Sequence, residues 1–264
     1  MEIATRERAY VGVVGPDAED YLQRMVSNDV EALADGESCA ALLLTPKARV
    51  IAPVVVLRRG PEDFLLLTER ELGEPVRAHL VRMRMRARCK IAREEHTSAL
   101  VFGGEGGIPT REFGEPAVEL LDAELEPTLD VVELERRRIE AGTPAWGKEI
   151  DERVLPAEAG LTATHVSFTK GCYPGQEPVA RLHHRGKANR SLRVLRVDAP
   201  EPPPYDAELS WEGKAVGRVT SVARRPDGVL VGLGYVRVEV PEEAELALDP
   251  AGSARGYTVS PSRP

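Results

Sequence analysis

KGCYPGQE at residues 170–177 is the stretch that decides most about this chain. Two glycines on either side of a proline predict a tight loop. Cys172 follows Lys170 by two residues, so a nearby ammonium could favour the reactive thiolate form. The alternative is a small apolar cysteine buried in a turn, which this stretch alone favours.

The residues that continue this loop are strongly basic. Positions 170–193 contain six basic residues and one acid, Glu177, within a chain of net charge -8. Such a stretch suits a polyanion, either a polyglutamate tail or an RNA backbone, and equally a solvated basic strand. The neighbouring His183 and His184 have no third ligand at a familiar spacing, so no metal site is predicted. The six basic residues are Lys170, Arg181, Arg185, Lys187, Arg190 and Arg193.

Glu140 stands in a second segment of interest, RIEAGTP at 138–144, which continues to GKEI at 147–150. One carboxylate can accept hydrogen bonds from adjacent donors, such as the amino group and ring N–H at the edge of a pterin. Taken alone, Glu140 is more simply explained as a surface residue at a helix end.

The composition limits the classes of protein to which this chain can belong. The chain has 264 residues, 42% of them hydrophobic, and a net charge of -8, which argues against a general nucleic-acid binder. Its three cysteines are far apart and form no CxxC pair, which disfavours disulfides, a zinc site and an iron–sulfur cluster held by this chain alone. No apolar run reaches the ~18 residues of a membrane span, and no secretory signal is apparent, so we expect a soluble, cytoplasmic protein.

The hydrophobic pattern predicts an α+β body of about 190 residues followed by a β-barrel. Short strands are expected at 10–15, 40–44, 50–57 and 64–67, with helices at 16–25, 75–83 and 129–138. Closely spaced strands with turns between them occupy 192–259. Residues 82–90 alternate basic and apolar side chains, which predicts a strand with one basic face, either solvated or anion-binding.

Several of these segments resemble the folate-binding YgfZ/GcvT-like family of the glycine-cleavage T-protein superfamily. Residues 170–177 match its KGC[FY]xGQE motif, and 138–150 resemble its R-x-E-x-G-x-P…G-x-[DE]-[IL] block. VSNDV at 26–30, LLTP at 43–46, GKAVGRVTS at 213–221 and VGLGYV at 231–236 look like further blocks. The resemblance implies a tri-domain ring: a ferredoxin-like part (1–95), a second α/β part completing a folate channel (96–190) and an antiparallel barrel (191–264).

The resemblance also implies roles for particular residues. Cys172, with Lys170, is expected to be the functional thiol, and tetrahydrofolate or another reduced folate the cofactor. The expected role is to support assembly or repair of client iron–sulfur enzymes, with RNA contact through 170–193 as a further possibility. The folate-binding residues predicted on this basis are Glu140, Tyr173, Arg185 and Asn28.

One departure from the superfamily separates its branches. Aminomethyltransferases carry an Asp-Asp pair where this chain has Ala52-Pro53, and neither replacement can exchange a proton. The glycine-cleavage reaction is therefore not expected, unless another acid substitutes. Three hypotheses remain: an iron–sulfur maintenance factor, a folate-dependent one-carbon transferase, and an RNA-binding factor in tRNA modification.

Overall fold

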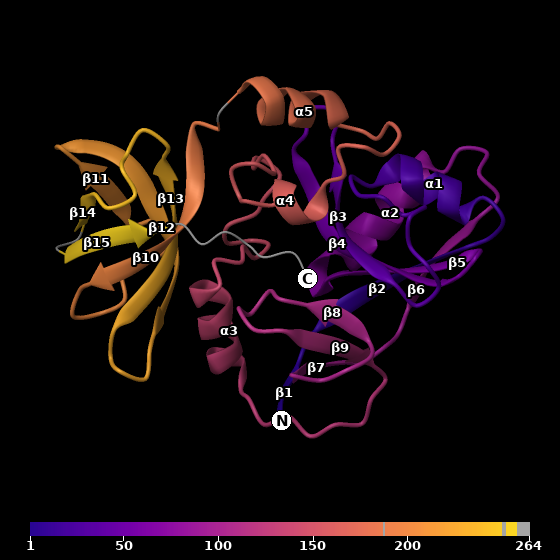
Figure 1. Ribbon diagram of the computed structural model, residues 1–264, viewed down its shortest axis with the longest axis horizontal. Coiled ribbons are helices and arrows are strands. Elements are labelled where there is room, and N and C mark those ends of the chain that lie inside the picture. Colours follow the sequence, from indigo (N-terminus) through magenta and orange to yellow (C-terminus); the bar gives the residue numbers. More distant parts are fainter. Residues whose placement is uncertain (187, 250–251, 258–264) are drawn as a thin grey trace.

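The computed structural model describes residues 1–186, 188–249 and 252–257. Their strands form three antiparallel units, two open sheets and one closed barrel (Figure 1). The barrel lies at one end of the molecule and the larger open sheet, with helices α1 and α2, at the other (Figure 1).

The larger sheet has the strand order β3-β4-β5-β2-β6. Helices α1 (Ala18–Met25) and α2 (Gly73–Met83) cover one face of it. On β5, Phe64 and Leu66 pack toward these helices, whereas Leu65 and Leu67 pack on the other face with Ile108 of the second sheet. Burial on both faces explains why residues 64–67 of this strand are all apolar. The strands are β2 (Arg8–Val14), β3 (Ser38–Leu44), β4 (Val50–Gly60), β5 (Asp63–Glu69) and β6 (Lys90–Glu94), with a short 3-10 helix, η1 (Arg70–Leu72), before α2.

The second sheet has the order β1-β7-β9-β8. Its strands are β1 (Glu2–Thr5), β7 (Ser98–Phe102), β8 (Ile108–Thr110) and β9 (Ala117–Leu121). Helix α3 (Val131–Glu140) packs Leu134 against this sheet, and its first turn is capped by the Asp130 carboxylate. The division of the chain at residues 95 and 190 stays a prediction. Strand β1 belongs to the predicted first part (1–95), but it pairs with β7, which belongs to the second (96–190).

The segment between α3 and the barrel carries two helices, α4 (Thr162–His165) and α5 (Gln176–Arg185). It packs against β3 and β4 through a separate apolar cluster that includes Leu42, Leu44 and Val179. The basic stretch was predicted to be a loop or strand, and that was wrong for its centre, which is helix α5. Pro178 is compatible with helix there because it lies in the first turn, where its missing N–H has no intrahelical partner.

The predicted barrel is confirmed, with the closed order β10-β13-β12-β11-β14-β15. Its strands are β10 (Arg190–Asp198), β11 (Glu208–Trp211), β12 (Lys214–Arg224), β13 (Leu230–Arg237), β14 (Glu245–Asp249) and β15 (Gly252–Tyr257). The last strand was predicted to end at residue 259. Residues 258 and 259 lie outside the described part of the chain, so the end of that prediction is not tested.

The strand predicted at 82–90 is not formed. Helix α2 continues to Met83, the chain turns through 84–89, and β6 begins only at Lys90. Met85 has a φ of +48°, which no strand accommodates. The alternating pattern at 82–90 therefore spans a helix end and a turn.

Candidate functional site

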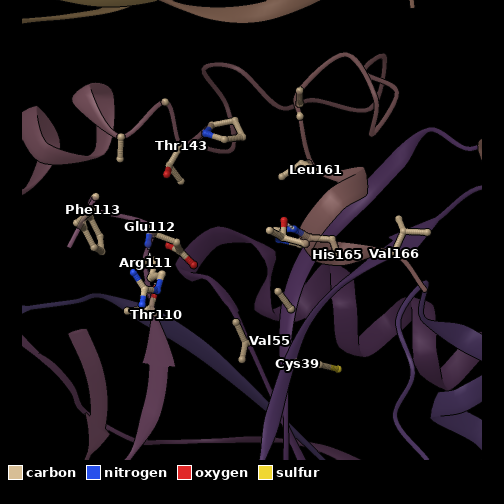
Figure 2. Close-up of a pocket in the computed structure, with 18 of the residues that line it drawn as sticks. Cys39, Val55, Thr110, Arg111, Glu112, Phe113, Thr143, Leu161, His165 and Val166 are labelled. Carbon is tan, nitrogen blue, oxygen red and sulfur yellow. Dashed lines mark hydrogen bonds between the residues drawn. The ribbon is translucent and has the colours of Figure 1, made fainter. Parts of the chain in front are cut away.

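A cavity of about 1180 Å³ lies where the two open sheets, helix α3 and the 157–169 segment meet (Figure 2). Its volume is slightly above the range typical of pockets for small organic ligands, about 300–1,000 Å³. Strand β10 contributes Ser191 and Leu192, so the barrel also borders it. Among the residues that line it are Cys39, Val55, Thr110, Arg111, Glu112, Phe113, Thr143, Leu161, His165 and Val166.

Two of the predicted folate-binding residues, Glu140 and Asn28, line this cavity. Glu140 is the last residue of α3, and its side chain is 22% exposed. One carboxylate oxygen accepts a hydrogen bond from Arg136 of the same helix, and the other accepts one of 2.5 Å from Arg225. Each oxygen has a second lone pair, so the carboxylate can still accept donors from a ligand.

Asn28 is mainly a support for the cavity wall. Its Nδ2 donates to the carbonyl oxygens of Ala40 (2.7 Å) and Thr164 (3.3 Å). Its Oδ1 accepts from the backbone N–H of Asp29. Both amide protons are therefore committed to the protein, and only an Oδ1 lone pair is left for a ligand.

A cluster of buried charges borders the cavity beside β8 and β9. Arg8 donates to Glu119 at 3.0 and 3.1 Å, and Arg6 contacts both Glu119 and Glu112. Burial alone would raise the pKa of Glu119, but the Arg8 and Arg6 charges outweigh it and lower the pKa to about 2. The pKa of Glu112 is also lowered, because burial is outweighed by the same arginines. These carboxylates are consequently ionised, ion-paired and poor proton acceptors at neutral pH.

His165 belongs to α4 and lies across the cavity from Glu112 (Figure 2). Its Nδ1 lies 2.7 Å from the hydroxyl of Thr164. Burial lowers the pKa of His165 to about 4, so the ring is neutral at physiological pH. A neutral imidazole on the wall can donate or accept a hydrogen bond toward a ligand.

The predicted thiol loop begins directly beyond the cavity rim, since Ser167, Phe168 and Thr169 still line the cavity. The Lys170 side chain turns back into the protein. Its Nζ donates to the carbonyl oxygens of Gln23 (2.6 Å), Val26 (2.8 Å) and Asn28 (2.7 Å). Burial lowers the pKa of Lys170 to about 8, which still leaves the ammonium mostly protonated at pH 7.

The other loop residues separate into exposed and buried groups. Cys172 is exposed, whereas Cys89 is buried and Cys39 is half-buried on the cavity wall, where desolvation raises its pKa to about 12. Tyr173 is buried in the apolar cluster beneath the loop, with the Lys170 ammonium 5.5 Å from its ring centre. Neither Cys172 nor Tyr173 lines the cavity.

Gly175 holds the end of this loop against the turn that follows β3. Its φ is +84°, and a Cβ placed there would lie 2.6 Å from the carbonyl oxygen of Thr45. Only glycine accepts both the left-handed backbone and this approach. Two segments that resemble family blocks, LLTP and KGCYPGQE, thus meet at one contact.

The basic stretch does not form one continuous cationic surface. Arg190 pairs with Glu158 and covers the Tyr235 ring, and the buried Arg193 donates to the carbonyl oxygens of Val240 and Pro241. Arg181 and Arg185 are exposed on α5, and Arg185 does not line the cavity. Lys187 lies outside the described residues.

Sequence reasoning missed a buried clamp in the 138–150 block. Arg138 Nη1 donates to Glu149 Oε2 at 3.0 Å, and Ser221 of the barrel bonds both side chains, at 3.0 Å to Arg138 and 2.6 Å to Glu149. Tyr235 donates to the Glu149 carbonyl at 2.7 Å. The clamp fixes α3, which carries Glu140, to the barrel. The sequence did contain a clue to this ion pair, because Arg138 and Glu149 are both charged positions of the 138–150 block.

Ala52 and Pro53 lie away from the cavity. Ala52 is fully buried under the helices of the larger sheet, and the Pro53 carbonyl accepts a 2.8 Å hydrogen bond from Thr68.

Within residues 1–186, 188–249 and 252–257, no cluster of three or more His, Cys, Asp or Glu side chains could hold a metal ion. In the same part of the chain, no helix is long and apolar enough to cross a membrane.

No family model matches the chain. It is 26% identical, over 86% of its length and 80% of the relative's, to the "tRNA-modifying protein YgfZ" of Pectobacterium carotovorum. It is 27% identical to the "Iron-sulfur cluster assembly factor IBA57 homolog, mitochondrial" of Pyricularia oryzae, covering 95% of this chain and 75% of the relative.

A crystal structure of glycine cleavage system aminomethyltransferase T from Bartonella henselae superposes with a TM-score of 0.86. That match covers 99% of this chain and 87% of the other at 19% identity. The fold is therefore that of the T-protein aminomethyltransferases, with the predicted α+β body and barrel confirmed. Over most of its length the chain is thus similar to the proteins named YgfZ and IBA57, and it shares the fold of the aminomethyltransferase.

Proposed function

We propose that this protein binds a reduced folate, tetrahydrofolate or a derivative, in the cavity and supports the assembly or maintenance of iron–sulfur proteins. The observation that carries the proposal is the 1180 Å³ cavity, whose wall includes the Glu140 carboxylate at the end of α3. The names of the YgfZ and IBA57 relatives support the iron–sulfur and tRNA-modification context.

The donor set of the cavity fits a folate. Glu140 offers lone pairs to the adjacent amino and ring N–H groups of a pterin. Phe113, Leu161 and Val166 supply apolar surface for the rings (Figure 2). Bound folate would supply a one-carbon carrier, whereas this chain's residues would bind and orient it.

Cys172 would then act outside the cavity, toward a partner. It is exposed at the tip of a loop that Lys170 and Gly175 hold at its two ends, while the other two thiols are buried or half-buried. We propose that the thiol meets a client iron–sulfur protein, while Lys170 keeps the loop in place. Arg185 has no part in the cavity, so its predicted contact with folate is confined to a tail that leaves the site.

The structure favours this role over aminomethyl transfer. This chain has Ala52 and Pro53 in place of the acid pair, neither of them on the cavity wall, and two of the carboxylates that do line the cavity, Glu112 and Glu119, are ion-paired with arginines. A base with a strongly lowered pKa takes up a substrate proton poorly at neutral pH.

The test of folate binding is a calorimetric titration of the wild type, Glu140→Gln and Glu115→Gln with tetrahydrofolate. Glu115 also lines the cavity but is exposed, so its variant controls for the lost charge. We expect binding by the wild type and Glu115→Gln, and at least about tenfold weaker binding by Glu140→Gln. A wild type that does not bind reduced folates would refute the folate proposal.

The test of the thiol is rescue of a bacterial strain that lacks its own YgfZ, scored by the activity of an iron–sulfur enzyme. We expect Cys172→Ala to fail and Cys89→Ala, which removes a buried core thiol, to rescue. Equal rescue by Cys172→Ala and the wild type would show that the thiol has no role.

A further inference from the structure

The turn between α2 and β6 exposes large apolar side chains to solvent. Val81, Met83 and Met85 are 38%, 41% and 89% exposed. They lie within five consecutive residues, at the C-terminal end of helix α2 and in the turn that follows it. Apolar surface gathered in this way marks an interaction site more often than scattered single residues do.

Met85 is unfavourable there on two counts. Its φ of +48° places a side-chain-bearing residue in the left-handed region, which costs about 1 kcal/mol relative to glycine. Its side chain is 89% exposed, so burial of apolar surface does not offset the free-energy cost of that backbone conformation. Neither backbone preference nor core packing explains a methionine at this position.

The same turn is strongly basic. Residues 81–90 contain five basic side chains and no acid, in a chain whose net charge is -8. Three are partly committed, since Arg88 pairs with Asp17 at 2.8 Å, Arg84 donates to the Cys89 carbonyl, and Arg82 Nη2 lies 3.2 Å from His79 Nδ1. Arg82, Arg86 and Lys90 are exposed in the same segment as the apolar group.

We propose that this Met/Arg surface, comprising Val81, Arg82, Met83, Met85, Arg86 and Lys90, docks an acidic segment of a partner protein. The partner's carboxylates would face Arg82 and Arg86, and its apolar side chains would cover Met83 and Met85. Methionine adapts its shape to varied partners, and Met and Arg are enriched at protein interfaces. Opposite charge would speed and orient the encounter.

The composition of the surface favours a protein partner over RNA. Single-stranded RNA is held by a basic groove in which bases stack on aromatic rings, and residues 81–90 contain no aromatic residue. Exposed Val and Met offer an apolar contact that a phosphate backbone cannot use.

The position of the surface lets it act independently of the folate site. None of residues 81–90 lines the cavity, and α2 covers the face of the larger sheet opposite to Val55, which does line it. A partner seated there leaves the cavity accessible. The inference therefore goes beyond folate binding and does not depend on it.

The experiment compares three probes against the full-length protein by biolayer interferometry: poly-L-glutamate, a glutamate–tyrosine copolymer, and a single-stranded RNA oligomer. We expect the copolymer to bind most tightly, since it offers both carboxylates and apolar groups. Met85→Gly should weaken copolymer binding at least about fivefold while thermal stability stays equal or rises, because glycine relieves the backbone strain. Arg82→Glu with Arg86→Glu should weaken binding of both polypeptides.

Val131→Ser is the matched control, because Val131 is 78% exposed on α3 and lies outside the Met/Arg surface. It should leave copolymer binding unchanged. The proposal is overturned if Met85→Gly binds the copolymer as the wild type does, or if the copolymer binds no better than polyglutamate. Tighter binding of RNA than of the copolymer, lost in the arginine variant, would also overturn it in favour of a nucleic-acid surface.

Discussion

The Lys170 ammonium donates a 2.6 Å hydrogen bond to the carbonyl oxygen of Gln23, 147 residues earlier in the chain. Gln23 lies in the last turn of α1, where carbonyl groups lack intrahelical partners and the helix dipole attracts a cation. Lys170 bonds the carbonyls of Val26 and Asn28 as well, so all three of its protons are used. The lysine of the motif is thus a C-terminal cap for α1 and an anchor for the loop that exposes Cys172.

Replacing Lys170 by methionine should destabilise the protein. The change keeps the length of the side chain but leaves three carbonyl groups without their donor, at a cost of about 2–4 kcal/mol. Urea unfolding would measure the loss in the free energy of unfolding. Lys214→Met, which alters an exposed lysine on the barrel, should stay within about 0.5 kcal/mol of the wild type. Equal effects of the two changes would contradict the anchoring role.

Three glycine-to-alanine changes separate backbone strain from steric overlap. Gly175→Ala combines a φ of +84° with a 2.6 Å overlap on Thr45 and should cost about 3 kcal/mol or more. Gly160→Ala, with a φ of +73° and open space, should cost about 1 kcal/mol. Gly171→Ala has neither problem and should be nearly neutral for stability. Thermal or urea unfolding of the series would reveal any other order, which would show that the Thr45 contact does not hold the loop.

How far the sequence predicts the fold depends on whether the signal is local. The barrel strands were predictable because apolar alternation and turn residues repeat along 207–237. Helix α5 was missed because Pro174, Gly175 and Pro178 resemble a loop, although Val179 packs into the core from one face of the helix. Strand β1 was missed because four residues carry too little pattern to identify a strand.

The site was predictable only in part, because its walls come from distant segments. Asn28, Glu112, Glu140 and His165 line one cavity, yet no spacing along the chain relates them. Motif resemblance identified Asn28 and Glu140, whereas Glu112 and His165 carry no sequence signal. Lys170 was expected to lie near the Cys172 thiol because only two positions separate them in the sequence. In the structure, the Lys170 side chain points away from the loop and binds the end of α1.

The clamp between α3 and the barrel should be sensitive to loss of one partner. Arg138→Met would leave the buried Glu149 carboxylate without its cation, and such a change typically costs about 3–5 kcal/mol. Arg153→Met removes an arginine that is 75% exposed and paired with Asp151, so it should cost under about 1 kcal/mol. Guanidinium-induced unfolding would measure both.

A double change gives the clamp a second test. Arg138→Met combined with Glu149→Leu removes both charges, so part of the lost stability should return relative to Arg138→Met alone. Effects of the two changes that simply add would show that the pair is not energetically coupled.

His165 should make the protein less stable in mild acid. Its pKa in the folded protein is lowered by burial from 6.5 to about 4, so between these pH values the unfolded chain binds more protons. The free energy of unfolding should therefore fall as the pH drops from 6.5 to 4, by about 1–3 kcal/mol from this residue. In His165→Gln that component is absent, so urea midpoints of variant and wild type should converge, or cross in favour of the variant, as the pH falls.

His96 supplies a control of opposite sign. Burial lowers the pKa of His96, but its bonds to Asp122 and Glu94 outweigh burial and raise the pKa overall. The wild type should thus gain stability over His96→Gln as the pH falls, and parallel curves for all three proteins would show that neither histidine is coupled to folding.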